Sequence, residues 1–169
     1  WCRVLDGKCR SRAIAILALT VVTHAARAHE HWVDVDEFQP TTCTNIEVRI
    51  CSGHYFPKSS FALEDKVLQD VELCCGDGKT VSVQTTMEDN QRTGTITVAS
   101  GGVHVVRFGL KRPRAKEPSY EAKTIMVVGE GIDDPARYAI GRGLELVPAK
   151  PLSGLRPGDE LPVILLRDG

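Results

Sequence analysis

Aromatic residues are scarce in this chain, and neither sign of charge dominates. Aromatics make up 5% of the sequence, and 21 Lys and Arg residues stand against 22 Asp and Glu, a net charge of −1. Binding to a phosphate backbone requires a basic surplus, so we expect no nucleic-acid partner. With 42% hydrophobic residues, 25% charged residues, 15 Gly and 9 Pro, the composition also excludes collagen-like, coiled-coil and disordered chains.

Motifs of known catalytic centres are missing as well. The sequence contains no G-x-S-x-G nucleophile elbow, no phosphate-binding P-loop and no H-E-x-x-H zinc motif. Gly101-Gly102 separates two apolar runs and is typical of a turn. We therefore predict that the protein is not an enzyme.

Residues 1–28 have the three regions of a signal peptide. A basic start containing Arg3 and Lys8 precedes the apolar run Ala13 to Val22, and Ala26-Arg27-Ala28 supplies a small-x-small cleavage site. The apolar run is about half of the roughly 20 residues that a membrane span requires. We expect cleavage after Ala28, export to the periplasm and no membrane span afterwards. The alternative is a buried N-terminal helix.

Beyond residue 28 the pattern favours strands. Val, Ile and Thr are plentiful, and Ile46, Val48 and Ile50 alternate with charged residues, as in a half-buried strand. The pattern predicts an all-β protein, an antiparallel Ig-like β-sandwich over residues 29–148. Residues 149–169 are expected to be a linker and the first strand of a truncated second β domain.

Turn residues predict how several of these strands connect. Gly76-Asp77-Gly78 predicts one β-hairpin, and the segment from Ala99 to Gly102 predicts another between 95–98 and 103–108. The basic segment Lys111 to Lys123 is expected to be an exposed loop. Asp134 is expected to cap a single helical turn that starts at Pro135 and runs to Tyr138.

The sequence His29-Glu30-His31-Trp32 would become the N-terminus after cleavage. In one chelating geometry, the new α-amino group, two backbone amides and the His31 ring surround Ni(II) or Cu(II) in a square plane. In the other, the amine and ring of His29 form a brace that a histidine from elsewhere in the fold completes, either His54 or His104. We predict a mixed nitrogen site built from His29, His31 and His54. The alternative is that these histidines hold no ligand.

Carboxylates and copper chemistry extend these possibilities. Glu30 and Asp34 are candidates for extra ligands or for orienting a ring, although solvated strand charges are commoner.

A histidine brace on a β-sandwich is also the arrangement of copper polysaccharide monooxygenases, but 5% aromatics gives poor support for the flat aromatic platform they would need.

The chain resembles a family of exported bacterial proteins of unknown function that is often described as the periplasmic component of an ABC-type cobalt/nickel uptake system. The resemblance rests on a leader ending directly before His, on HEHWVDVDEFQP, GHYFP and AKTIMVVG, and on GLELVP and LRPGDELPVILLRDG. It implies a β-sandwich followed by a second Ig-like domain, and a role in handling a transition metal. His29 and His54 are the matching positions. His31 replaces an aromatic or apolar residue of the family pattern and leaves the metal preference open.

Four cysteines follow the leader: Cys43, Cys51, Cys74 and Cys75. An even number in an exported chain indicates disulfides. A Cys51–Cys74 bridge would form if their strands are neighbours, with Cys43 and Cys75 left over, whereas a bridge between the adjacent Cys74 and Cys75 is disfavoured. The competing interpretation is a Cu(I) or Zn thiolate cluster, although no C-x-x-C spacing occurs.

Two functions from different classes follow. The first is a periplasmic protein that binds Ni(II) or Co(II), with Cu(II) as a third candidate, and presents the ion to a membrane transporter. The second is a β-sandwich interaction module of the cell envelope that binds no metal. Intrinsic affinity alone would favour copper over nickel and cobalt, so supply, geometry or a partner must decide the metal.

Overall fold

The computed structural model describes residues 29–111 and 120–168. The predicted signal peptide therefore lies outside the described residues. In these two ranges, ten strands and one short 3-10 helix follow one another: β1 (Glu30–Val35), β2 (Asn45–Gly53), β3 (Leu68–Cys74), β4 (Thr80–Ser82), β5 (Thr85–Glu88), β6 (Gln91–Thr97), β7 (Gly102–Leu110), β8 (Glu121–Val128), η2 (Pro135–Arg137), β9 (Leu144–Pro148) and β10 (Val163–Arg167). Within the described ranges, no helix is long and apolar enough to cross a membrane.

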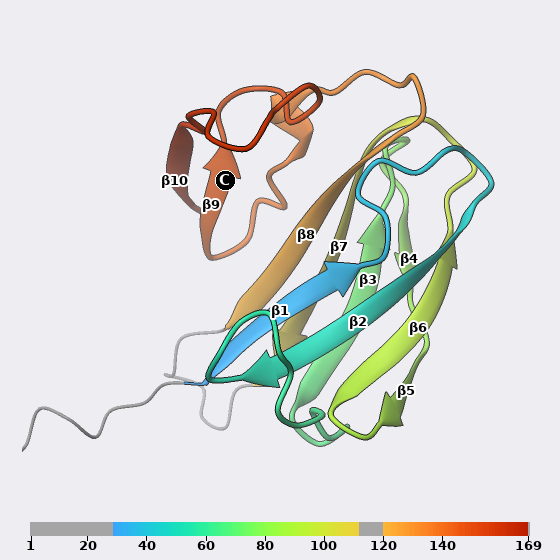
Figure 1. Cartoon of the computed structure of the whole chain (residues 1–169), viewed down its shortest axis with the longest axis vertical. Coiled ribbons are helices and arrows are strands. Elements are labelled where there is room, and N and C mark those ends of the chain that lie inside the picture. Colours follow the sequence, from blue (N-terminus) through green and yellow to red (C-terminus); the bar gives the residue numbers. More distant parts are fainter. Residues whose placement is uncertain (1–28, 112–119, 169) are drawn as a thin grey trace, which may run out of the picture.

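Two antiparallel four-stranded sheets form a β-sandwich, which confirms the predicted fold class. One sheet has the order β1-β2-β6-β5 and the other the order β4-β3-β7-β8 (Figure 1). The inward residues of β2, Ile46, Val48 and Ile50, are fully buried, as their alternation predicts. Phe108 of β7 and Met126 of β8 meet them in the same hydrophobic core.

Of the two predicted hairpins, one is confirmed and one is wrong. β3 and β4 pair around the turn at Gly76 to Gly78. β6 and β7 do not pair with each other, because β6 lies between β2 and β5 while β7 lies between β3 and β8 in the opposite sheet. The segment 98–101 therefore crosses between sheets. A turn motif cannot distinguish these outcomes, since both connect two antiparallel apolar strands.

The disulfide prediction is wrong for the described residues, where all four cysteines are free. Cys51 and Cys74 belong to strands of different sheets, so no bridge connects them. Cys51 is 3% exposed despite its outward position, because it lies in register between Trp32 and Gln91 on the neighbouring strands.

The expected loop from 111 to 123 is wrong at its C-terminal end. β8 begins at Glu121, and the half-buried Lys123 lies within this strand. Residues 112–119 lie outside the described part. The predicted helical turn is confirmed, with the Asp134 side chain accepting a hydrogen bond from the Ala136 amide at 3.0 Å.

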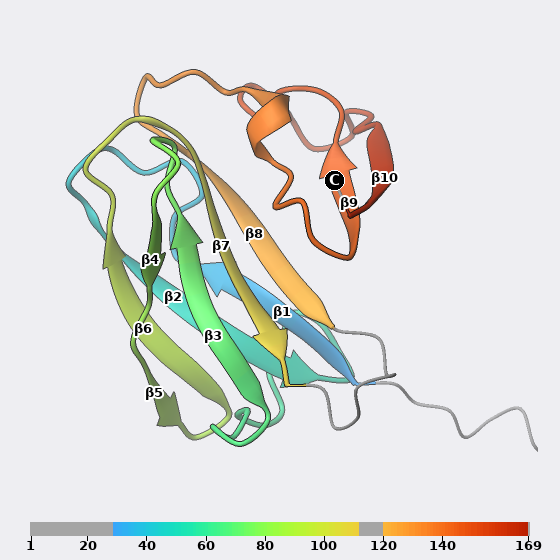
Figure 2. The same ribbon diagram turned by 180° about the vertical axis from the view of Figure 1, so that it is seen from behind.

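The strands β9 and β10 form a separate two-stranded sheet beside the sandwich (Figure 2). They lie on either side of the expected boundary at residue 148, and the division into two domains stays a prediction. Val147 and Leu166 pack toward Val103 and Val105 of β7. The opposite face of this sheet carries apolar side chains that are more than half exposed, those of Leu144, Leu146, Val163 and Leu165.

Candidate functional site

The register between β1 and β2 brings His29 and His54 together. Glu30 pairs with Gly53 and His31 with Ser52, so the residues that come next on each strand, His29 and His54, stand opposite each other. Their ring centroids are 4.6 Å apart, with the ring planes at 71°. Two histidines that are 25 positions apart in the sequence therefore meet at one end of the sandwich.

His31 points in the same direction as His29 and is held by hydrogen bonds. Its Nδ1 lies 2.8 Å from Oγ of Ser52, a residue with no exposed surface. The hydroxyl of Tyr120 donates to the His31 carbonyl at 3.0 Å. Burial lowers the pKa of the His31 imidazole, and neighbouring His29 lowers it further. The ring is therefore largely neutral at pH 7, which is the form that binds metals.

Aromatic side chains surround these histidines. The Phe61 ring lies 5.0 Å from that of His29 and 6.5 Å from that of His31, centroid to centroid. The ring centroid of Tyr120 lies 5.2 Å from that of His31. On the outer side, Trp32 packs against Phe56 at 5.4 Å, and Tyr55 approaches His54 at 6.5 Å. Five of the nine aromatic residues of the chain thus gather at this end, which their low overall content did not predict.

The remaining candidates are not part of this cluster. His104 is 1% exposed at the start of β7, and its Nε2 donates to the Ser100 carbonyl at 2.9 Å. It cannot complete a brace with His29. The start of β7 pairs with the end of β8, and this place lies at the opposite end of the sandwich from the start of β1 (Figure 2). Asp34 is bound to Arg49 at 2.8 Å, whereas Glu30 is exposed.

Within 29–111 and 120–168, no group of three or more His, Cys, Asp or Glu side chains is arranged to hold a metal ion. The histidine pair at the ends of β1 and β2 supplies two imidazoles, and His31 is turned toward Ser52. Binding of a metal here requires a further donor. An α-amino group on His29 would be such a donor after cleavage at residue 28.

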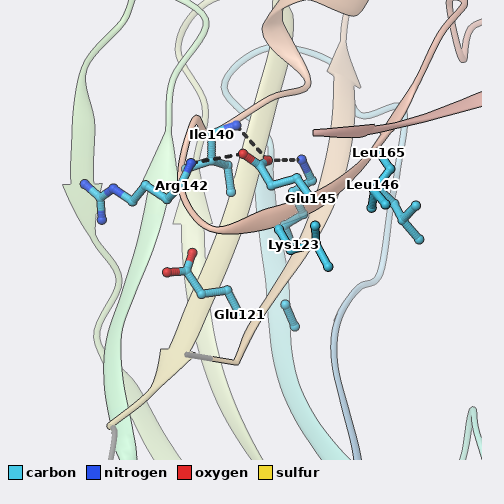
Figure 3. Close-up of a pocket in the computed structure, with 9 residues that line it drawn as sticks. Glu121, Lys123, Ile140, Arg142, Glu145, Leu146 and Leu165 are labelled. Atoms are coloured by element: carbon cyan, nitrogen blue, oxygen red, sulfur yellow. Dashed lines mark hydrogen bonds and ion pairs between the residues drawn. The ribbon is translucent and has the colours of Figure 1, made fainter. Parts of the chain in front are cut away.

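Away from the histidines, a cavity of about 440 Å³ lies between β8 and the β9–β10 sheet (Figure 3). Glu145 lines this cavity, and its carboxylate accepts hydrogen bonds from the amides of Ile140, Gly141 and Arg142 and lies 2.5 Å from Lys123 Nζ. Burial would raise the pKa of Glu145, but Lys123 and these amides outweigh it and lower the pKa. The contacts of Glu145 connect β9 to β8 and to the segment before β9, which indicates a structural role for this carboxylate. No sequence pattern predicted this arrangement, because Lys123, which neutralises the carboxylate, comes from a different strand 22 positions earlier in the chain.

Comparisons with known proteins give the family. The description "Domain of unknown function (DUF4198)" belongs to the family whose sequence model matches residues 26–169. No curated protein matches. A solved structure of a DUF4785 family protein from Legionella pneumophila is 14% identical, with a TM-score of 0.40, over 70% of this chain and 31% of that chain.

A second solved structure, the multi-modular cell-surface chitinase ChiW from a Paenibacillus species, is 12% identical with a TM-score of 0.35. The similarity covers 59% of this chain and 9% of the chitinase. This chain therefore spans less than a third of either solved protein. By its sequence, the chain belongs to the DUF4198 family of domains of unknown function.

Proposed function

We propose that this protein, cleaved before His29, binds a divalent transition-metal ion in the periplasm and supports its uptake through a membrane transporter. Nickel and cobalt are the first candidates and copper is the third. The observation that carries the proposal is the position of His29 directly across from His54, with ring centroids 4.6 Å apart. The family assignment leaves the ligand open.

The chemistry of this end of the molecule supports nitrogen ligation. After cleavage, the α-amino group of His29 would have an ordinary pKa near 8 and would be available as a donor close to neutral pH. The same residue contributes its imidazole, and His54 contributes a second imidazole from the neighbouring strand. Imidazole nitrogen suits nickel, copper and zinc alike, so this donor set selects transition metals over calcium and magnesium.

Strand pairing favours the brace over the square-planar mode. The square plane uses the amide nitrogens of Glu30 and His31, which both lie in β1, and the His31 amide donates to the Tyr120 hydroxyl at 3.4 Å. Wrapping these amides around an ion would break the start of this strand. The brace uses only the amine and side chains, so β1 and β2 stay paired.

His31 is the third imidazole in this proposal. Where its Nδ1 donates to Ser52, the lone pair lies on Nε2, the nitrogen left free for an ion. Its low pKa supports this role, because a neutral ring needs no deprotonation on binding. Phe61, in contact with both His29 and His31, adds an apolar wall that reduces the access of water.

The exposed apolar face of the β9–β10 sheet favours the second candidate function, an interaction module of the cell envelope without metal. Leu144, Leu146 and Leu165 are 62 to 70% exposed on this face. Clusters of exposed apolar side chains are typical of protein contact surfaces. This function predicts that the histidines are dispensable.

Calorimetric titration of the chain beginning at His29 with Ni(II), Co(II) and Cu(II) tests the proposal. We expect one ion per chain, with at least tenfold weaker binding in His29→Ala and His54→Ala. Lys58→Ala is the matched control, since Lys58 lies exposed in the turn that follows His54. Absence of stoichiometric binding for all three ions would refute metal capture and favour the interaction module.

A further inference from the structure

The cavity between β8 and the β9–β10 sheet has mostly apolar walls. Its volume of about 440 Å³ lies within the range of about 300 to 1,000 Å³ that is typical of small-molecule sites. Leu146 and Leu165, which line it, are 63% and 62% exposed. An apolar ligand in contact with them would remove this surface from water, which favours binding. The other apolar side chains of the walls are those of Ala122, Ile140 and Leu144.

Four ionisable side chains also line the cavity, and three of them have partners. Lys123 and Glu145 form an ion pair at 2.5 Å, and Glu121 lies 3.4 Å from the guanidinium of Arg107. The fourth, Arg142, is exposed, and its guanidinium has no ion pair or hydrogen bond within residues 29–111 and 120–168. One positive charge at this cavity therefore lacks a counter-charge.

The turn that carries Arg142 is fixed by its backbone. The amides of Gly141 and Arg142 donate to the Glu145 carboxylate at 2.7 and 3.1 Å. The Gly143 amide donates to the Asp168 carboxylate at 3.1 Å. Gly141 and Gly143 have φ angles of 76° and 61°, in the left-handed region that favours glycine. The base of the Arg142 side chain is therefore held in place, which reduces the ordering that anion binding requires.

The free charge and the exposed leucines lie at different ends of this place. Figure 3 shows the guanidinium of Arg142 at one end of the lining side chains and Leu146 and Leu165 at the other. A guanidinium binds a carboxylate through two parallel hydrogen bonds. An elongated ligand with a carboxylate at one end and an apolar chain at the other matches this arrangement.

We propose that this cavity binds a single-chain alkyl carboxylate, a fatty-acid anion, with its carboxylate on Arg142 and its chain against Leu146 and Leu165. The charge of the ligand supplies the counter-charge that Arg142 lacks. Binding is non-covalent, so no bond of the ligand is broken. No histidine is among the side chains that line the cavity, so the proposal does not depend on metal binding.

Amide chemical shifts of the full-length chain during titration with sodium octanoate test this site. We expect saturable shifts at Ile140, Leu144, Leu146 and Leu165. We also expect at least tenfold weaker binding of 1-octanol, which has the same number of carbon atoms and no charge. Absence of saturable shifts at these residues, or equal affinities for octanoate and 1-octanol, would overturn the proposal.

Matched variants separate the charge from the apolar wall. We expect Arg142→Ala to weaken octanoate binding at least tenfold, to the affinity for 1-octanol, and Leu146→Ser to weaken the binding of both compounds. Arg156→Ala is the control, because Arg156 is an exposed arginine between β9 and β10 that does not line the cavity. Unchanged octanoate affinity in Arg142→Ala would contradict the proposal, whatever the folding of the Leu146 variant. Ni(II) titration of the same samples keeps this outcome distinct from that of the proposed function.

Discussion

The ammonium group of Lys123 on β8 lies 2.5 Å from the carboxylate of Glu145 on β9, and both side chains are mostly buried. The same ammonium group donates to the Tyr138 carbonyl at 2.7 Å. This pair connects the C-terminal sheet to the sandwich, together with the apolar contacts of Val147 and Leu166.

Replacing Glu145 by Gln is expected to lower the free energy of unfolding by about 3 kcal/mol or more, because a buried ammonium group loses its counter-charge. The pKa of Glu145 is lowered in the fold, so this contribution is present above the unfolded pKa and is lost as the pH falls through the folded pKa. Urea unfolding at pH 7 and at acidic pH measures both effects. Glu64→Gln, in an exposed pair with Lys66, is the control and should cost about 0 to 1 kcal/mol. An equal loss in both variants would contradict the structural role of the buried pair.

The buried ring of His104 is expected to give the stability of the fold a second dependence on pH. Burial lowers the pKa of its ring, and the hydrogen bond to Ser100 only partly offsets this effect. Its Nδ1 has no hydrogen-bond partner among the described residues, so a proton added there would lack an acceptor. Stability due to the neutral ring is full above the unfolded pKa of about 6.5 and decreases as the pH falls toward the folded pKa.

His104→Gln is therefore expected to flatten the dependence of the unfolding free energy on pH below about 6.5. Part of the slope that remains should come from His31, whose pKa is also lowered, and His31→Gln should reduce it further, whereas Glu145 contributes at more acidic pH. Thermal unfolding at several pH values measures this. A slope unchanged by His104→Gln would show that this ring does not titrate as the fold implies.

A substitution at Ser52 is expected to weaken metal binding, although Ser52 is not a proposed ligand. Its hydroxyl is the hydrogen-bond partner of His31 Nδ1, and loss of such a partner typically weakens metal binding by about 10- to 100-fold. Ser52→Ala should therefore raise the Kd for Ni(II) by about tenfold, as measured by calorimetry. Ser82→Ala, at an exposed position of β4, should leave the Kd unchanged. Equal Kd values for the two variants would exclude a role for the His31 ring.

Local patterns predicted much of the sandwich. The alternation of Ile46, Val48 and Ile50 indicated both a strand and its buried face, because successive side chains of a strand point to opposite sides. The turn at Gly76 to Gly78 predicted the β3–β4 pairing for a similar reason, since short glycine-containing turns connect neighbouring strands.

The sequence patterns did not predict which strands pair or how distant segments pack. Whether the chain between Thr97 and Gly102 turns within a sheet or crosses to the other depends on the packing of the whole core. His29 and His54 were predicted to share a site, but the β1–β2 register that brings them together was not predicted, and neither was the docking of β9 that pairs Lys123 with Glu145. The disulfide prediction was wrong because it rested on the even number of cysteines. The sequence did not show that the strands of Cys51 and Cys74 belong to different sheets.

The free amine of His29 is the central element of the proposed function, and one added residue tests it most directly. Ni(II) titration should compare the chain that starts at His29 with the same chain preceded by a single Ala, which removes the amine from His29 and keeps every side chain. The account predicts binding weakened at least tenfold by the extension. Equal affinity of the two chains would contradict it.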